Sequence, residues 1–191
     1  MNNPLLSLNL QIKKEADEIL YEEGLLSILS GFGIPHLTGS YSLDLMTWRD
    51  LDIYLQADEL TEADFFRLGS RISTIFKPLK MSFRNERIAQ TKNLPLGFYW
   101  GVYLGDERAG AWKIDIWAMD TAECQRLVQF CTDIRNELTP AIALSILGIK
   151  SQCWQDPAYR RSYNSLDIYR AVLDGHVTDV EGFRRYLATG G

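Results

Sequence analysis

The stretch from His36 to Leu55 constrains the fold and function of this chain more than any other. It places a Gly-Ser pair, Gly39-Ser40, ahead of an Asp-x-Asp pair, Asp50 and Asp52. Apolar and polar residues alternate around the second pair, which predicts a strand with one apolar face and both carboxylates on the other face. Two carboxylates one strand repeat apart, roughly 6–7 Å between Cα atoms, repel unless positive charge lies between them. Because Mg²⁺ prefers carboxylate and phosphate oxygens, the stretch predicts a magnesium site.

A third acid, Asp115, lies in the strand pattern of residues 111–118, between two isoleucines. An acid in such a position is costly unless it has a partner. The local pattern alone favours an ion pair or an exposed sheet face. Together with Asp50 and Asp52, however, Asp115 becomes a candidate third metal ligand, and Lys113 is then close enough to contact a phosphate.

The Gly-Ser pair is a candidate phosphate site. A short helix is expected over residues 41–46, with Ser40 at its start. A glycine allows a ligand to approach the backbone, and the free N–H groups of a helix start favour an anion. By itself the pair is more simply an ordinary helix cap, and only its position before Asp-x-Asp favours the phosphate. We expect Arg49, next to Asp50, to contact the phosphates or to close a salt bridge.

The remaining pattern predicts an α+β protein in two parts, with a mixed sheet flanked by helices in residues 1–119 and a helical subdomain in residues 120–191. The first thirty residues have a helical pattern, a capping box at Thr61 and Asp64 begins another helix, and residues 81–91 have a strand pattern. Residues 96–104 and 111–118 predict an antiparallel hairpin. Residues 142–149 are apolar on nearly all sides, which indicates a central helix. The basic pairs at 160–161 and 184–185 are expected to face water, with a nucleotide as the alternative that stays open.

Composition excludes several classes of protein. The net charge of −5 over 191 residues argues against nucleic acid as a partner. Three cysteines without CxxC spacing (Cys124, Cys131 and Cys153) are expected to be small buried apolar residues. The sequence has no apolar run of membrane-spanning length and no signal-peptide pattern, so we expect a cytoplasmic protein.

Over about residues 30 to 118, the chain resembles the nucleotidyltransferase superfamily typified by polymerase β, and within it the small antibiotic-modifying and minimal nucleotidyltransferases. The family pattern is a hydrophobic residue with Gly-Gly or Gly-Ser, then Asp-hydrophobic-Asp-hydrophobic, then a distant hydrophobic-Asp-hydrophobic. Matching segments here are Gly39-Ser40, Asp50-Leu51-Asp52-Ile53 and Ile114-Asp115-Ile116. Thr38 is a weak match to the pattern, since it stands where the family has a hydrophobic residue.

The resemblance implies a magnesium-dependent transfer of a nucleoside monophosphate, expected to be AMP, from a nucleoside triphosphate to a hydroxyl of a small molecule or a protein. In that case Asp50 and Asp52 would hold two Mg²⁺ ions, and Asp115 would bind the metal nearest the acceptor hydroxyl. Gly39 and Ser40 would hold the β and γ phosphates. The nucleotide-binding residues would also include Arg49 and Lys113.

Two alternatives stay open. The same fold can serve as an antitoxin-like or regulatory protein that acts mainly by binding a protein partner, for which Trp154, Tyr159, Tyr163 and Tyr169 could supply an exposed aromatic face. The other alternative is an α/β domain in which Asp-x-Asp is coincidental, or belongs to a Ca²⁺ or sugar-nucleotide site.

Overall fold

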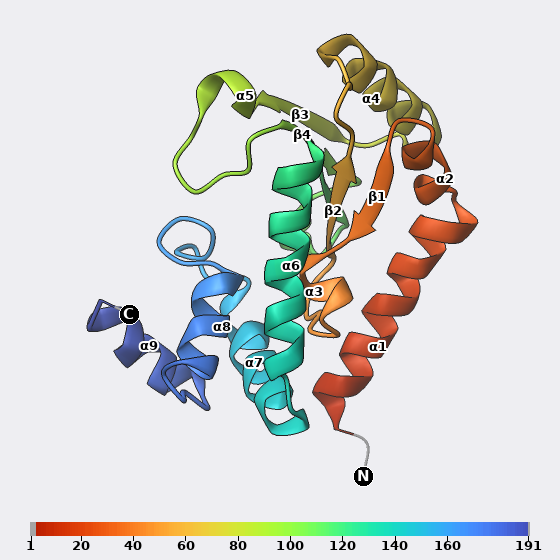
Figure 1. The fold of residues 1–191 in the computed structure, drawn as a ribbon. Helices are drawn as coiled ribbons and strands as arrows, with labels where there is room; N and C mark the ends of the chain where they lie inside the picture. Colours follow the sequence, from red (N-terminus) through yellow and green to blue (C-terminus); the bar gives the residue numbers. More distant parts are fainter. Residues whose placement is uncertain (1–2, 191) are drawn as a thin grey trace.

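The computed structural model describes residues 3–190 and contains a mixed sheet with helices on both sides (Figure 1). The elements of the first half are α1 (Pro4–Asp17), the π-helical turn η1 (Glu18–Glu22), α2 (Leu25–Ser30), β1 (Ile34–Leu37), α3 (Gly39–Ser42), β2 (Asp50–Gln56), α4 (Glu62–Phe76) and β3 (Lys80–Asn85). Those of the second half are α5 (Glu86–Ala89), β4 (Phe98–Tyr103), the 3-10 turn η2 (Glu107–Ala109), β5 (Lys113–Met119), α6 (Thr121–Glu137), α7 (Pro140–Cys153), α8 (Ser165–Leu173) and α9 (Val180–Ala188). The predicted α+β class is confirmed.

Within the described residues the sheet has five strands in the order β1-β2-β5-β4-β3. The central pair, β2 and β5, is parallel, whereas the other neighbouring strands are antiparallel. The hairpin predicted from residues 96–104 and 111–118 is present as β4 and β5. The parallel pairing places the starts of β2 and β5 at the same edge of the sheet, with Asp50 opposite Lys113 and Asp52 opposite Asp115.

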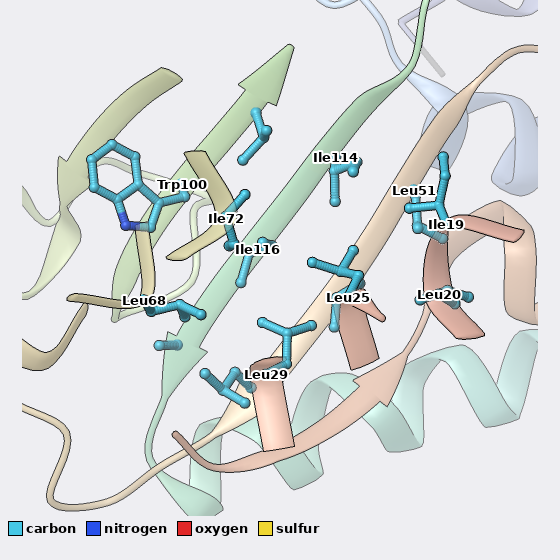
Figure 2. Packing of buried hydrophobic residues seen from close by; sticks show 14 of the residues in the cluster. Ile19, Leu20, Leu25, Leu29, Leu51, Leu68, Ile72, Trp100, Ile114 and Ile116 are labelled. Atoms are coloured by element: carbon cyan, nitrogen blue, oxygen red, sulfur yellow. The ribbon is translucent and has the colours of Figure 1, made fainter. Parts of the chain in front are cut away.

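One face of the sheet is covered by η1, α2 and α4, as Figure 2 shows. Leu51 from β2 and Ile114 and Ile116 from β5 point into this layer, and all three are fully buried. Removing a side chain of this size from water contributes about 1.5–3 kcal/mol. The alternation in the sequence therefore fixes which face is the core, and it directs Asp50, Asp52 and Asp115 to the opposite face.

The opposite face is partly covered by α6, which contacts β2 and runs beside it in Figure 1. Below it, α7 packs against α1, α8 and α9. As the apolar pattern of residues 142–149 predicts, α7 is central: Ile146, Leu147 and Ile149 are fully buried in a second hydrophobic core. The boundary expected near residue 120 stays a prediction, since α1 packs against both halves.

Several local predictions are confirmed. The capping box at the start of α4 is formed, with reciprocal hydrogen bonds between Thr61 and Asp64. Cys124 and Cys153 are buried free thiols, and Cys131 is half-buried. In the described part of the chain, no helix is both long and apolar enough to cross a membrane.

Other local predictions are wrong. The strand pattern of residues 81–91 ends at Asn85 and continues as the short helix α5, because the Glu86 carboxylate accepts the backbone N–H of Thr91 and closes a turn. The short helix expected over residues 41–46 lies earlier, at Gly39–Ser42, and ends before Asp44, which has a positive φ of 57°.

The four aromatic residues that the sequence suggested for an exposed face do not form one. Tyr159, Tyr163 and Tyr169 are between 4 and 8% exposed and belong to the second core, and Trp154 packs against it. These aromatic side chains, which would have favoured a protein-binding role if exposed, therefore serve internal packing.

Candidate functional site

The site is built around three carboxylates on the open face of the sheet. Asp52 and Asp115 are direct partners in the parallel pair β2–β5, and Asp50 precedes Asp52 by one strand repeat. All three side chains are half-buried, with 17% of Asp50 and 14% of Asp115 exposed. The sequence predicted this grouping, and the register of the two strands brings it about.

Two cations compensate the carboxylates in this structure. The Lys113 ammonium lies 2.5 Å from Asp115 Oδ2 and 3.9 Å from Asp50 Oδ1. The Arg160 guanidinium lies 2.8 Å from Asp50 Oδ2 and 2.6 Å from Glu107 Oε2. Arg160 is exposed, but it faces the cleft and is paired with Asp50, because the loop between α7 and α8 carries it back to the sheet.

Burial and charge divide the three acids. Burial opposes ionisation of Asp50, but Lys113 and Arg160 together hold its pKa below the usual value. Asp52 lacks such a partner, so burial and repulsion from Asp50 and Asp115 raise its pKa to about 7. Burial also raises the pKa of Asp115, although Lys113 opposes this. The group therefore has a deficit of positive charge centred on Asp52.

This donor set fits a hard divalent cation. Carboxylate oxygens are the ligands that Mg²⁺ prefers, and Asp50 Oδ1 is buried without a hydrogen-bond partner. Within residues 3–190 the acidic, imidazole and thiol groups do not form a ready-made three-ligand metal site, and Lys113 and Arg160 contact Asp50 and Asp115. Metal binding here would require these two cations to give way or to turn to the phosphates of a nucleotide.

The Gly-Ser pair lies directly beside Asp52. The backbone N–H and the hydroxyl of Thr38 both donate to the Asp52 carbonyl, at 3.0 and 3.2 Å, which fixes the loop against β2. Gly39 has a φ of +59°, and a Cβ on this residue would collide with the Asp52 carboxylate. The position thus requires glycine for its backbone conformation and for space.

Replacing Gly39 with alanine should both destabilise the fold and displace the Asp52 carboxylate. The positive φ alone costs an alanine about 1–2 kcal/mol, and the clash adds to this. Gly24→Ala is the matched control, because Gly24 also has a positive φ (+82°) but open space around its Cβ position. Chemical denaturation should show a larger loss for Gly39→Ala than for Gly24→Ala, and equal losses would contradict the assigned clash.

Ser40 is hydrogen-bonded to a buried lysine that the sequence pattern did not single out. Lys150, in the middle of α7, is fully buried and donates to Ser40 Oγ at 2.5 Å and to the Leu45 carbonyl at 2.7 Å. Its ammonium also lies 4.6 Å from the ring centre of Trp48. Burial lowers the pKa of Lys150 to about 7, although the charges of Asp50 and Asp52 oppose the shift. The available signal was a single charge in an otherwise apolar helix.

The carboxylates form the floor of an open cleft of about 550 Å³. Its walls come from the sheet on one side and from the loop before α8 on the other. The lining residues are Asp50, Asp52, Ser82, Arg84, Leu94, Tyr99, Tyr103, Lys113, Asp115, Trp117, Tyr159, Arg160, Asn164 and Ser165. A volume of this size is in the range of small-ligand sites.

The remaining predicted residue, Arg49, makes a salt bridge. Its guanidinium donates to both carboxylate oxygens of Glu15, at 2.5 and 2.8 Å, and to the Gly110 carbonyl at 3.3 Å. Of the two roles expected for Arg49, the structure shows the salt bridge, whereas its contact with phosphate stays a prediction.

The comparisons with known proteins agree with this geometry at the level of the fold. Family models and curated protein sequences give no match. The structure is similar to that of a cytoplasmic RNA terminal U-transferase (TM-score 0.55, 11% identity, covering 90% of this chain and 51% of that chain). It is also similar to terminal uridylyl transferase 4 from Trypanosoma brucei with bound UPU (TM-score 0.50, 15% identity, covering 91% of this chain and 60% of that chain).

The chain therefore has the polymerase β-like nucleotidyltransferase fold. It spans only about half to three fifths of the length of these two structures. At 11 and 15% identity, the likeness concerns the fold.

Proposed function

We propose that this chain is a magnesium-dependent nucleotidyltransferase that moves a nucleoside monophosphate, AMP in the first instance, from a nucleoside triphosphate to a hydroxyl of a small molecule or a protein. The observation that carries the proposal is the direct pairing of Asp52 with Asp115, beside the unpartnered Oδ1 of Asp50. Three carboxylates that repel one another at the floor of a ligand-sized cleft are suited to a cation that accompanies a phosphate. The fold likeness supports the same class of reaction.

In this proposal each residue of the site has a separate task. Asp50 and Asp52 hold magnesium, which when bound neutralises the triphosphate and activates the acceptor hydroxyl. Asp115 would complete the magnesium site nearest that hydroxyl and would accept the hydroxyl's proton. Ser40, with Gly39 before it, holds the phosphates that leave as pyrophosphate. Positioning and electrostatic compensation are the main means of catalysis in phosphoryl transfer.

Lys113 and Arg160 supply further positive charge at the edge of the cleft. In this structure they neutralise Asp50 and Asp115. With a triphosphate in the cleft, both side chains would turn toward its oxygens, and Asp50 and Asp52 would then be free to hold magnesium.

The donor base and the acceptor are open parts of the proposal. The names of the two similar structures mention RNA and uridylyl transfer, so UTP belongs among the donors to be tested. The net charge of −5 still leads us to prefer a small molecule or a protein as acceptor over nucleic acid. The alternative of a regulatory protein that acts mainly by binding a partner is less well supported, because the aromatic residues suggested for its binding surface pack in or against the second core.

Calorimetric titration with ATP, GTP, CTP and UTP, each with and without magnesium, tests the proposal. We expect at least one nucleotide to bind, and its affinity to fall when magnesium is replaced by a chelator. The preferred nucleotide then names the donor base. If none of the four binds with magnesium present, the transferase proposal is wrong.

A further inference from the structure

The carboxylate that should receive an acceptor hydroxyl already has one beside it. The Tyr99 hydroxyl, from β4, donates to Asp115 Oδ1 at 2.7 Å. The other oxygen of the same carboxylate is held by Lys113. A tyrosine of the chain therefore makes the contact that the proposed function assigns to the substrate's hydroxyl.

The Tyr99 hydroxyl has room beside Asp115 because residue 101 is a glycine. Gly101 lies opposite Asp115 in the β4–β5 pair, and a Cβ on Gly101 would collide with the Tyr99 hydroxyl. The Tyr99 ring packs against Trp117, with 4.7 Å between ring centres, and only 9% of Tyr99 is exposed. The phenol is thus fixed in orientation, with its oxygen at the cleft.

The other tyrosines of the cleft are engaged differently. The Tyr103 ring lies near two ammonium groups, 4.9 Å from that of Lys80 and 5.8 Å from that of Lys113. The Tyr159 hydroxyl pairs with Ser165 Oγ at 2.7 Å. Among the tyrosines that line the cleft, Tyr99 is the one that is hydrogen-bonded to a carboxylate of the site.

We propose that Tyr99 is itself a nucleotide acceptor, so that the chain attaches a nucleoside monophosphate to its own Tyr99 hydroxyl. This inference rests on the proposed function and names an acceptor for it. The Tyr99 oxygen attacks the α-phosphorus of a bound nucleoside triphosphate, and the bond from that phosphorus to the pyrophosphate oxygen breaks. The phenol proton passes to Asp115 Oδ1. The products are a tyrosyl phosphodiester and pyrophosphate.

The adduct has a consequence for the site. The attached nucleotide lies in the cleft of about 550 Å³ that a second nucleotide would need. Modification should therefore be self-limiting, and a fully modified chain should no longer bind free nucleoside triphosphate.

Intact mass spectrometry of the full chain, followed by peptide mapping, tests the inference. The protein is incubated with magnesium and each of the four nucleoside triphosphates, and calorimetry on the same samples reports nucleotide binding separately. We expect a mass increase of one nucleoside monophosphate residue on the peptide that contains Tyr99. Modified protein, separated from free nucleotide, should fail to bind the nucleotide in calorimetry.

Two substitutions sharpen the result. Tyr99→Phe should bind nucleotide but gain no mass, whereas Tyr21→Phe, at an exposed tyrosine outside the cleft, should still be labelled at Tyr99. Binding without any mass gain in the wild type would overturn this inference and leave the proposed function standing, as would a label mapped to another residue. If the wild type binds no nucleotide, both proposals fall.

Discussion

Asp52→Asn is expected to weaken magnesium-dependent nucleotide binding by about 100-fold or more, the size of effect that follows the loss of a charged ligand. Asp52 is the carboxylate at the centre of the group, opposite Asp115 and two residues from Asp50. Asparagine keeps the shape of the side chain but removes the negative charge that holds a cation. Titration of the variant with the preferred nucleotide and magnesium measures the loss.

The same substitution should make the metal-free protein more stable at pH 8. Since the pKa of Asp52 is raised from 3.8 to about 7 in the fold, the folded state binds more protons than the unfolded state between these values. The contribution of Asp52 to stability therefore falls as the pH rises from about 4 to about 7. We expect Asp52→Asn to gain about 2 kcal/mol over the wild type at pH 8, a discounted value because the side chain is only half-buried.

Denaturation at pH 4 and pH 8 in the presence of a chelator checks this sign. The advantage of Asp52→Asn should be small at pH 4 and present at pH 8. Asp133→Asn is the control, since Asp133 is exposed on α6 and hydrogen-bonded to Gln129. If the variant is less stable than the wild type at pH 8, the ionised Asp52 carboxylate stabilises the fold, and the predicted destabilisation is contradicted.

Much of this site could be predicted because it depends on strand periodicity. Alternation around Leu51 and Ile53 places Asp50 and Asp52 on one face, and the same alternation places Asp115. Burial of the apolar face then requires the acids to project from the other face. The alternation does not show that β2 and β5 are neighbours, which the pairing of Asp52 with Asp115 also requires. Only the family resemblance implied that these two strands lie together.

The groups that compensate the acids could not be predicted in the same way. Arg160 lies in a polar loop more than a hundred residues from Asp50 in sequence, and it has a positive φ of 65°. An arginine pair in such a loop is typical of a solvated surface. Its position depends on how α7 and α8 pack, which side-chain periodicity does not encode. Tyr99 was similarly hidden in a strand whose residues are nearly all aromatic or apolar.

Lys150→Met is expected to lower nucleotide affinity about 10- to 100-fold, although Lys150 is fully buried. An ammonium group only donates hydrogen bonds, so Ser40 Oγ must accept from Lys150. The Ser40 hydroxyl hydrogen is then directed to another acceptor, which is the Tyr169 oxygen 3.3 Å away in this structure and would be a phosphate oxygen with nucleotide bound. Methionine fills similar space but removes both this orientation and the positive charge behind the Gly-Ser pair.

Stability measurements separate this role from simple packing. Because the pKa of Lys150 is lowered from 10.5 to about 7, the folded state binds fewer protons than the unfolded state between these values, and wild-type stability gains from Lys150 as the pH rises. Relative to the wild type, Lys150→Met should therefore be most favourable at pH 6 and lose on the order of 3 kcal/mol of that advantage by pH 10. Lys14→Met, at an exposed position of α1, is the matched control for loss of a lysine side chain.

A double-mutant cycle with Ser40→Ala decides whether Lys150 acts through Ser40. If Lys150 orients the Ser40 hydroxyl, the two substitutions together should weaken nucleotide binding by less than the product of their separate effects. Strictly multiplicative effects would mean that Lys150 contributes only its charge. Unchanged affinity in Lys150→Met, with the fold intact, would remove the Gly-Ser pair and its lysine from the phosphate site and leave the three carboxylates as its only support.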